Sequence, residues 1–237
     1  ETRVPLPRRR LGRTGLEVAI LGLGAMDTPV SPEAAATVHA ALDAGITFID
    51  TAREYAGSEY LLAQVIRERG RLDVQIATKT FSRTADGAQR DVDRSLSMLG
   101  VDVIDLYQLH DVSTPEAWAQ VMAEEHGALE GLRIAQARGL IRHIGVSSHS
   151  LEVLPWIIAS DAFDSVMVEY SAFYPQTRDL IVQAAARDLG VIVMRPLGGS
   201  GRTSVMRGRA ARGTLDEVTP ERLLRYALSA PGVSAAI

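Results

Sequence analysis

Short apolar runs recur along this chain at intervals of roughly thirty residues, about the length of one β-strand plus one α-helix. Three of them end in a polar residue, and these runs are Ile46–Asp50, Val74–Lys79 and Ile104–His110. Their β-branched and other apolar residues are typical of strands. Because Asp50, Lys79 and His110 each end one of these regularly spaced strands, we expect them to share one site.

The stretches between these runs have the spacing and the end signals of helices. Ser31 and Pro32 are typical of a helix start, and Gly45 follows the end of the same helix. Ser58 is likewise expected to cap the next helix, and Gly100 to end the one after it. The expected strands cover residues 20–24, 46–50, 74–78, 105–109, 144–147, 165–169, 191–195 and 233–237. Besides the helix that ends at Gly100, the expected helices cover residues 31–44, 58–68, 117–137, 151–159, 179–189 and 220–230.

Strict alternation of strands and helices indicates parallel strands with right-handed crossovers, and eight strands suit closure into a barrel. Glycines also bracket a turn in an expected hairpin at residues 9–18. The predicted fold is therefore α/β, a (β/α)8 TIM barrel with a short N-terminal β-hairpin, in one domain spanning residues 1–237. The alternative is a doubly wound open sheet. It is disfavoured because the segment Gly22–Asp27 after the first strand lacks the G-x-G-x-x-G turn.

Composition narrows the class of partner. The formal net charge is -4, which gives no electrostatic reason to expect nucleic acid or an anionic membrane. The cluster Arg8–Arg10 is too short to change this and is interpreted as a solvated lead-in. The chain has no cysteine, so disulfides, thiolate metal sites and a cysteine nucleophile are excluded. Without an apolar leader or a membrane-length run, a soluble cytoplasmic protein is expected.

Tyr55 lies just past the second expected strand and gives the three polar residues a chemical interpretation. A tyrosine has a pKa of about 10, and a nearby ammonium such as that of Lys79 lowers it. Asp50 would pair with Lys79, while His110 would hydrogen-bond a substrate oxygen. Together these four residues can support the reduction of a carbonyl group, with Tyr55 as general acid. No side chain donates hydride, so a nicotinamide cofactor is implied.

At these residues the chain resembles the aldo-keto reductase superfamily, over nearly all of residues 11–237. The resemblance is carried by four segments, namely Asp50–Glu59, Ile76–Lys79, Asp105–His110 and Ile144–Ser148. It implies an NADP-dependent oxidoreductase, with NAD as the alternative, that acts on aldehydes or ketones or in the reverse direction. It also implies that Asp50, Tyr55, Lys79 and His110 form the catalytic tetrad of the family.

The resemblance also implies cofactor contacts. They are assigned to Gly24, Asp50, Ser147, Ser148, Met167, Arg195, Leu197, Gly198, Gly199 and Gly201. The residues from Arg195 to Gly201 resemble the pyrophosphate loop of the family, whose glycines let backbone N–H groups approach phosphate oxygens. Three positions depart from the family pattern. Ser148 replaces the commoner asparagine, Met167 a glutamine, and Met194 an aromatic residue that stacks on the nicotinamide.

Simpler interpretations exist for each feature. Asp50 and Lys79 would make a structural ion pair if they stood alone, and the glycine-rich loop would be a flexible connection. The histidines other than His110 are interpreted as structural, and Trp118 is left out of the site. No metal site is expected, because the H-x-x-x-H and H-E-x-x-H patterns are absent.

Two further expectations follow from the resemblance. Some barrels of this family are cofactor-binding regulatory subunits, so a redox-sensing module with little turnover is the alternative function. The sequence also stops before the eighth helix of the family and before the segment that binds the adenosine 2′-phosphate. We therefore expect a longer physical protein whose C-terminal segment orders when cofactor binds, with a gap near Gly208–Gly213 for the same reason. Substrate identity and oligomeric state do not follow from the sequence.

Overall fold

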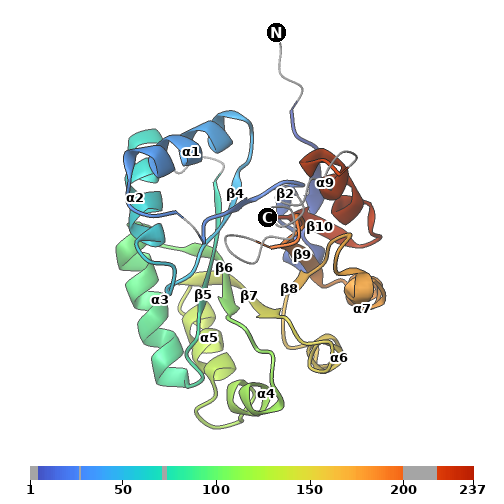
Figure 1. Cartoon of the computed structure of the whole chain (residues 1–237). Helices are drawn as coiled ribbons and strands as arrows, with labels where there is room; N and C mark the ends of the chain where they lie inside the picture. Colours follow the sequence, from blue (N-terminus) through green and yellow to red (C-terminus); the bar gives the residue numbers. More distant parts are fainter. Residues whose placement is uncertain (1–4, 27, 71–73, 200–217) are drawn as a thin grey trace.

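The computed structural model describes residues 5–26, 28–70, 74–199 and 218–237, and Figure 1 shows their arrangement. The sheet consists of β3 (Leu23–Gly24), β4 (Phe48–Asp50), β5 (Gln75–Thr80), β6 (Ile104–Leu109), β7 (Ile141–Ser148), β8 (Ser165–Glu169), β9 (Gly190–Met194) and β10 (Val233–Ala236). These strands follow one another in the sheet in chain order, and each neighbouring pair is parallel.

The sheet closes on itself where the segment before β3 meets β10. Leu21 forms a parallel bridge with Ala236. The N–H of Gly22 donates to the carbonyl of Ala236 at 2.8 Å, and the N–H of Ala236 donates to the carbonyl of Ile20 at 2.9 Å. The predicted (β/α)8 barrel is therefore confirmed, and the open-sheet alternative is wrong, because an open sheet would leave these edges unpaired.

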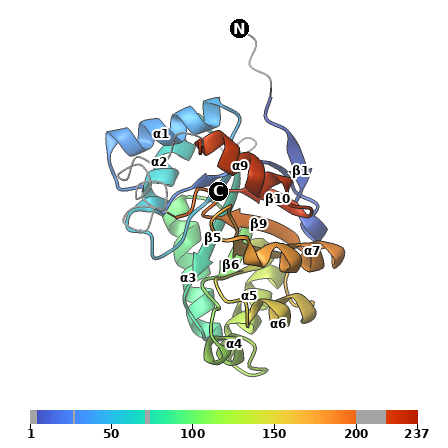
Figure 2. The ribbon, with the colours of Figure 1, turned by 45° about the vertical axis from the view of Figure 1, so that its right-hand side comes forward.

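Helices lie on the outside of the strands, as Figure 1 and Figure 2 show from two directions. They are α1 (Pro32–Asp43), α2 (Ser58–Arg69), α3 (Ala85–Leu99), α4 (Pro115–Val121), α5 (Ala128–Ala137), α6 (Leu154–Ala159), α7 (Arg178–Ala186) and α9 (Pro220–Ser229). The hydroxyl of Ser31 accepts the N–H of Ala34 at 3.2 Å, so the predicted cap of α1 is confirmed.

The predicted cap of α2 is wrong. Gly57 precedes this helix with a φ of 77°, a conformation that favours glycine, and Ser58 is the first helical residue. The Ser58 hydroxyl is instead hydrogen-bonded to the hydroxyls of Thr51 at 2.7 Å and of Thr28 at 3.0 Å. Ser58 therefore connects the start of α2 to the loop that follows β4.

The single helix expected over residues 117–137 is also wrong, because the structure has α4 and α5 there. His126 has a φ of 67°, which is incompatible with a continuous helix, and its carbonyl accepts the N–H of Ala85 at 2.7 Å. A Cβ on Gly127 would lie 2.5 Å from the carbonyl oxygen of Ala123. The chain thus turns between α4 and α5. The turn leaves the carbonyl of His126 free to accept the N–H of Ala85 at the start of α3.

The predicted N-terminal hairpin is confirmed. Strands β1 (Arg8–Arg10) and β2 (Glu17–Ala19) pair antiparallel. Leu11 and Val18 are fully buried and pack against inward-facing side chains of the barrel, which are Phe48, Ala77, Leu106, Met167, Ile192 and Ala235. Gly190, at the start of β9, leaves room for Leu11. The hairpin therefore fills the N-terminal end of the barrel, and the C-terminal end is left for a site.

Candidate active site

Strand alternation brings the polar side chains to one level of the barrel. Asp50 pairs with Ala77 in the sheet register, and Lys79 pairs with Gln108. Side chains of alternate residues face the same side of a strand. Asp50, Lys79 and Gln108 therefore lie one step above the inward-facing apolar residues Phe48, Ala77 and Leu106, toward the C-terminal end of the barrel.

A cavity of about 800 Å³ opens at this end of the barrel, and all four predicted catalytic residues line it, namely Asp50, Tyr55, Lys79 and His110. Asp50 ends β4 and His110 follows the last residue of β6. Lys79 belongs to β5, and Tyr55 comes from the loop after β4. The structure therefore brings together the residues that the sequence places in one site.

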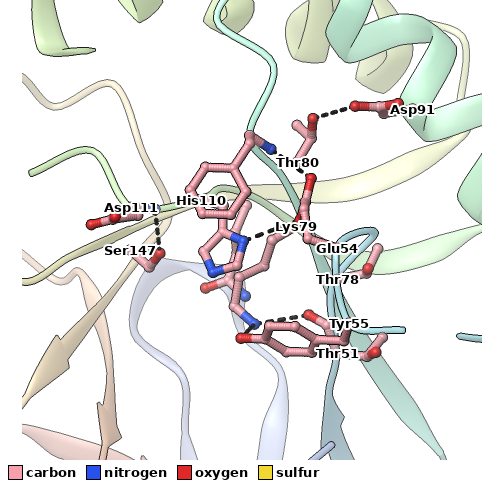
Figure 3. Close-up of polar contacts among 12 residues, drawn as sticks. Thr51, Glu54, Tyr55, Thr78, Lys79, Thr80, Asp91, His110, Asp111 and Ser147 are labelled. Carbon is pink, nitrogen blue, oxygen red and sulfur yellow. Dashed lines mark hydrogen bonds and ion pairs between the residues drawn. The ribbon is translucent and has the colours of Figure 1, made fainter. Parts of the chain in front are cut away.

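Lys79 is the centre of the polar group in Figure 3. Its Nζ donates to Oδ2 of Asp50 at 2.5 Å, to the carbonyl of Thr51 at 2.8 Å and to the hydroxyl of Tyr55 at 3.4 Å. The side chains of Lys79 and Asp50 are 1% and 2% exposed. An ammonium that is buried in this way keeps its charge only if its partners hold it in place.

Burial raises the pKa of the Asp50 carboxyl, and Lys79 and Gln108 oppose the rise. The side-chain amide of Gln108 donates to Oδ1 of Asp50 at 3.0 Å. Gln108 was missed as a site residue in the sequence, although its place two residues before His110 on the same strand is a signal for it. Its amide leaves Oδ2 of Asp50 free to accept from Lys79.

A tight turn places Tyr55 over Lys79. The N–H of Tyr55 donates to the carbonyl of Ala52 at 3.1 Å, and the N–H of Ser58 donates to the carbonyl of Tyr55 at 3.0 Å. The ring centroid lies 4.8 Å from the Nζ of Lys79. The phenol therefore has its hydroxyl beside a buried cation while its ring lines the cavity.

His110 is held by two residues that the sequence did not indicate, Glu54 and Phe81. Oε2 of Glu54 lies 3.2 Å from Nδ1 of His110, and Oε1 of Glu54 accepts the N–H of Phe81 at 3.1 Å. The Phe81 ring stacks on the imidazole, with 4.1 Å between centroids, and the Tyr55 ring meets its edge at 5.6 Å. The position of Glu54 next to Tyr55 is the one sequence signal that could have indicated it.

Most of the predicted cofactor residues line the same cavity. Gly24, Asp50, Ser147, Met167, Arg195, Leu197 and Gly199 are among its walls. Ser148 does not line it, because alternation turns its side chain away from that of Ser147, and its hydroxyl accepts the N–H of Ser150 at 3.2 Å. Gly198 lies between the lining residues Leu197 and Gly199, and its φ is 85°. Gly201 and the segment Gly208–Gly213 lie outside the described residues.

A second polar group lies on the wall formed by β7, β8 and β9. Glu169 accepts from Arg195 at 3.0 Å and is 3.2 Å from Nδ1 of His149. His149 and Arg195 line the cavity, so His149, interpreted from the sequence as structural, faces the site. Arg195 has a φ of 56°, which is uncommon for a non-glycine residue.

Within the residues that the structure describes, no three or more histidine, aspartate or glutamate side chains are grouped so that they could hold a metal ion. Among the helices described, none is both long and apolar enough to cross a bilayer.

Comparison with known proteins gives consistent matches. A model of the Aldo/keto reductase family matches residues 20–218. The chain is 26% identical, over 97% of its length and 85% of the other protein, to the uncharacterized oxidoreductase YqkF of Bacillus subtilis. It is 34% identical to the aldo-keto reductase YhdN of the same organism, over 73% of this chain and 56% of that protein.

A solved structure adds evidence on the fold. The holo form of the aldo-keto reductase AKR11C1 from Bacillus halodurans matches 98% of this chain and 85% of its own, with a TM-score of 0.81. At 24% identity this likeness shows the fold alone.

Proposed function

We propose, given that the chain belongs to the aldo/keto reductase family, that it reduces aldehydes or ketones to alcohols, or catalyses the reverse oxidation, at the cavity in its barrel. NADPH is the cofactor that we propose, with NADH as the alternative. One barrel domain would carry the activity, and the substrate would be a small carbonyl compound.

The observation that carries this proposal is the position of the Lys79 Nζ between the Asp50 carboxylate and the Tyr55 hydroxyl. Tyr55 donates its phenolic proton to the oxygen of the substrate as negative charge develops there. The ammonium of Lys79 stabilises the phenolate that remains, and Asp50 keeps that ammonium in place. In the oxidative direction, the Tyr55 phenolate takes the proton of the alcohol.

The residues around the cavity fit a nicotinamide cofactor. The side chains of Met167, Met194 and Leu197 give an apolar wall, and Ser147 adds a hydroxyl to it. Gly198 and Gly199 have φ angles of 85° and 103°, a backbone conformation that side chains disfavour. The N–H of Gly198 donates to the carbonyl of Arg195 at 2.9 Å and closes a turn, and Gly199 lines the cavity without a Cβ that would shield its own N–H. When bound, a reduced nicotinamide supplies the hydride, which no side chain can give.

The activity is tested by incubating the protein with NADPH or NADH and a panel of aldehydes, ketones and sugars, nitrobenzaldehyde among them. The proposal predicts a substrate-dependent loss of the near-ultraviolet absorbance of the reduced nicotinamide. Binding of cofactor without turnover of any member of the panel, or of the corresponding alcohols with oxidised cofactor, would contradict the proposal. That result is the one expected of a redox-sensing subunit.

A further inference from the structure

The imidazole of His110 has two nitrogens in different surroundings. Nδ1 is 3.2 Å from Oε2 of Glu54, a distance typical of a hydrogen bond. The ring lines the cavity, and within the described residues Nε2 has no hydrogen bond. Nε2 is therefore the nitrogen available to a substrate oxygen, and Nδ1 is the one available to Glu54.

Both oxygens of Glu54 are used by donors. Oε1 accepts the N–H of Phe81 at 3.1 Å, while Oε2 faces Nδ1 of His110. Burial alone would raise the pKa of Glu54, but the hydrogen bonds from His110 and the Phe81 N–H outweigh it and lower that pKa. Glu54 is thus a carboxylate that can only accept, so the proton between it and His110 belongs to Nδ1.

The orientation of the ring is fixed from other directions as well. Phe81 stacks on one face of the imidazole at 4.1 Å and 25°. The guanidinium of Arg83 donates to the carbonyls of His110 and Asp111, each at 2.9 Å. The imidazole is thus held between a stacked ring and a clamped backbone, and it cannot exchange its nitrogens by rotation without losing the contact to Glu54.

We infer that Glu54 is a positioning residue that keeps a proton on Nδ1 of His110. It thereby determines whether Nε2 can donate a hydrogen bond to the substrate or only accept one. The inference rests on the proposed function and names a further residue of the same site. In the neutral ring, Nε2 carries no proton and can only accept a hydrogen bond. It becomes a donor when the ring is the imidazolium.

Reduction then needs the imidazolium form of His110. A carbonyl oxygen can only accept a hydrogen bond, so reduction uses the imidazolium, whose Nε2–H points at that oxygen. Several charged or titratable groups surround this ring, and they are Asp50, Glu54, Tyr55, Lys79, Arg83 and Asp111. Glu54 is hydrogen-bonded to Nδ1 of this ring at 3.2 Å.

The inference is tested by recording long-range ¹H–¹⁵N spectra of the whole chain with ¹⁵N-labelled histidine, at alkaline pH where the ring is neutral. The chain has five histidines, and the His110 signals are identified by their loss in His110→Gln. We expect the Nδ1–H tautomer for His110 in the wild type. An Nε2–H tautomer there would overturn the inference, and this measurement does not depend on any variant of Glu54.

Glu54→Gln should reverse the tautomer. The backbone N–H of Phe81 needs an acceptor, so the introduced amide places its oxygen there and its NH₂ toward Nδ1 of His110. The neutral ring then carries its proton on Nε2. Glu169→Gln is the matched control, because Glu169 is 3.2 Å from Nδ1 of His149 and should change the signals of that histidine alone. An unchanged His110 tautomer in Glu54→Gln would contradict the inference.

Kinetics give a second readout. In Glu54→Gln, neutral His110 can donate from Nε2, so the fall of kcat/KM for reduction at alkaline pH should move upward by about one pH unit or more. Identical pH profiles for this variant and the wild type would overturn the inference. Because the spectrum reports the tautomer without turnover, an inactive protein with its proton on Nδ1 would contradict the proposed function and support the role of Glu54.

Discussion

The Nζ of Lys79 lies 2.5 Å from Oδ2 of Asp50, and both side chains are almost fully buried at the mouth of the barrel. A charge in this environment is costly unless it is paired, and removing one partner of such a pair typically costs about 3–5 kcal/mol. An ion pair that only stabilised the fold would not need a tyrosine hydroxyl beside its ammonium. The hydroxyl of Tyr55, 3.4 Å from the same Nζ, gives the ammonium a chemical role as well.

Lys79→Met should therefore damage both stability and activity. We expect a loss of about 3 kcal/mol or more in the free energy of unfolding, because Asp50 is left buried without its cation. Any remaining activity should have its pH dependence shifted upward, because the charge that stabilises the Tyr55 phenolate is gone. The measurements are urea denaturation and the pH profile of carbonyl reduction, in which wild type and variant should not superimpose.

The double variant Asp50→Asn/Lys79→Met separates these two effects. It removes both charges, so it should recover most of the stability lost in Lys79→Met while activity stays low. Asp50→Asn alone should harm activity less than Lys79→Met does, since the ammonium remains beside Tyr55. If the double variant regained activity together with stability, the role assigned to Lys79 would be wrong.

A prediction on packing concerns Gly131 of α5. A Cβ at this position would lie 2.3 Å from the carbonyl oxygen of Ala85, at the start of α3. Since backbone must move to make room, Gly131→Ala should destabilise the protein by about 1–3 kcal/mol. Arg133→Ala, on the exposed face of the same helix, is the control and should change stability by less than about 0.5 kcal/mol. Equal unfolding midpoints for the two variants would contradict the close approach of α3 and α5.

A prediction on pH concerns Asp164, whose carboxylate accepts the N–H of Ile144 at 2.9 Å and lies 3.7 Å from His143. Burial raises its pKa, but His143 and this N–H outweigh burial and lower the pKa. A carboxyl whose pKa is lowered by folding contributes stability above its unfolded pKa of about 3.9 and loses it as pH falls through the folded value. Asp164→Asn should thus be less stable than the wild type near neutral pH, with a difference that shrinks below about pH 4. A difference that is constant with pH in urea denaturation would contradict this.

Much of the barrel could be predicted because its strands and helices have strong local signals. The strand Ser165–Glu169 was predicted with its observed bounds, since its apolar run is flanked by turns. The helix break at His126 was missed because it depends on a tertiary contact, the hydrogen bond from the N–H of Ala85. The cap predicted at Ser58 was wrong for a similar reason, since its hydroxyl is bound by the hydroxyls of Thr51 and Thr28.

The site was predicted to the extent that its residues stand at strand ends. Asp50, Lys79 and His110 follow from the spacing of the strands, whereas Gln108, Glu54 and Phe81 join the site through side-chain contacts across strands and loops. No periodic pattern marks a residue whose function comes from such contacts. The roles of these residues, and those of the predicted cofactor residues, stay predictions until they are measured.

The central claim is that Tyr55 is the acid that protonates the carbonyl oxygen. The most direct test is the steady-state rate of nitrobenzaldehyde reduction by wild type and Tyr55→Phe, together with cofactor binding measured by fluorescence titration. Loss of the one transferable proton should lower kcat by about a hundredfold or more while cofactor affinity stays within about twofold of the wild type. Reduction by Tyr55→Phe at the wild-type rate would contradict the claim.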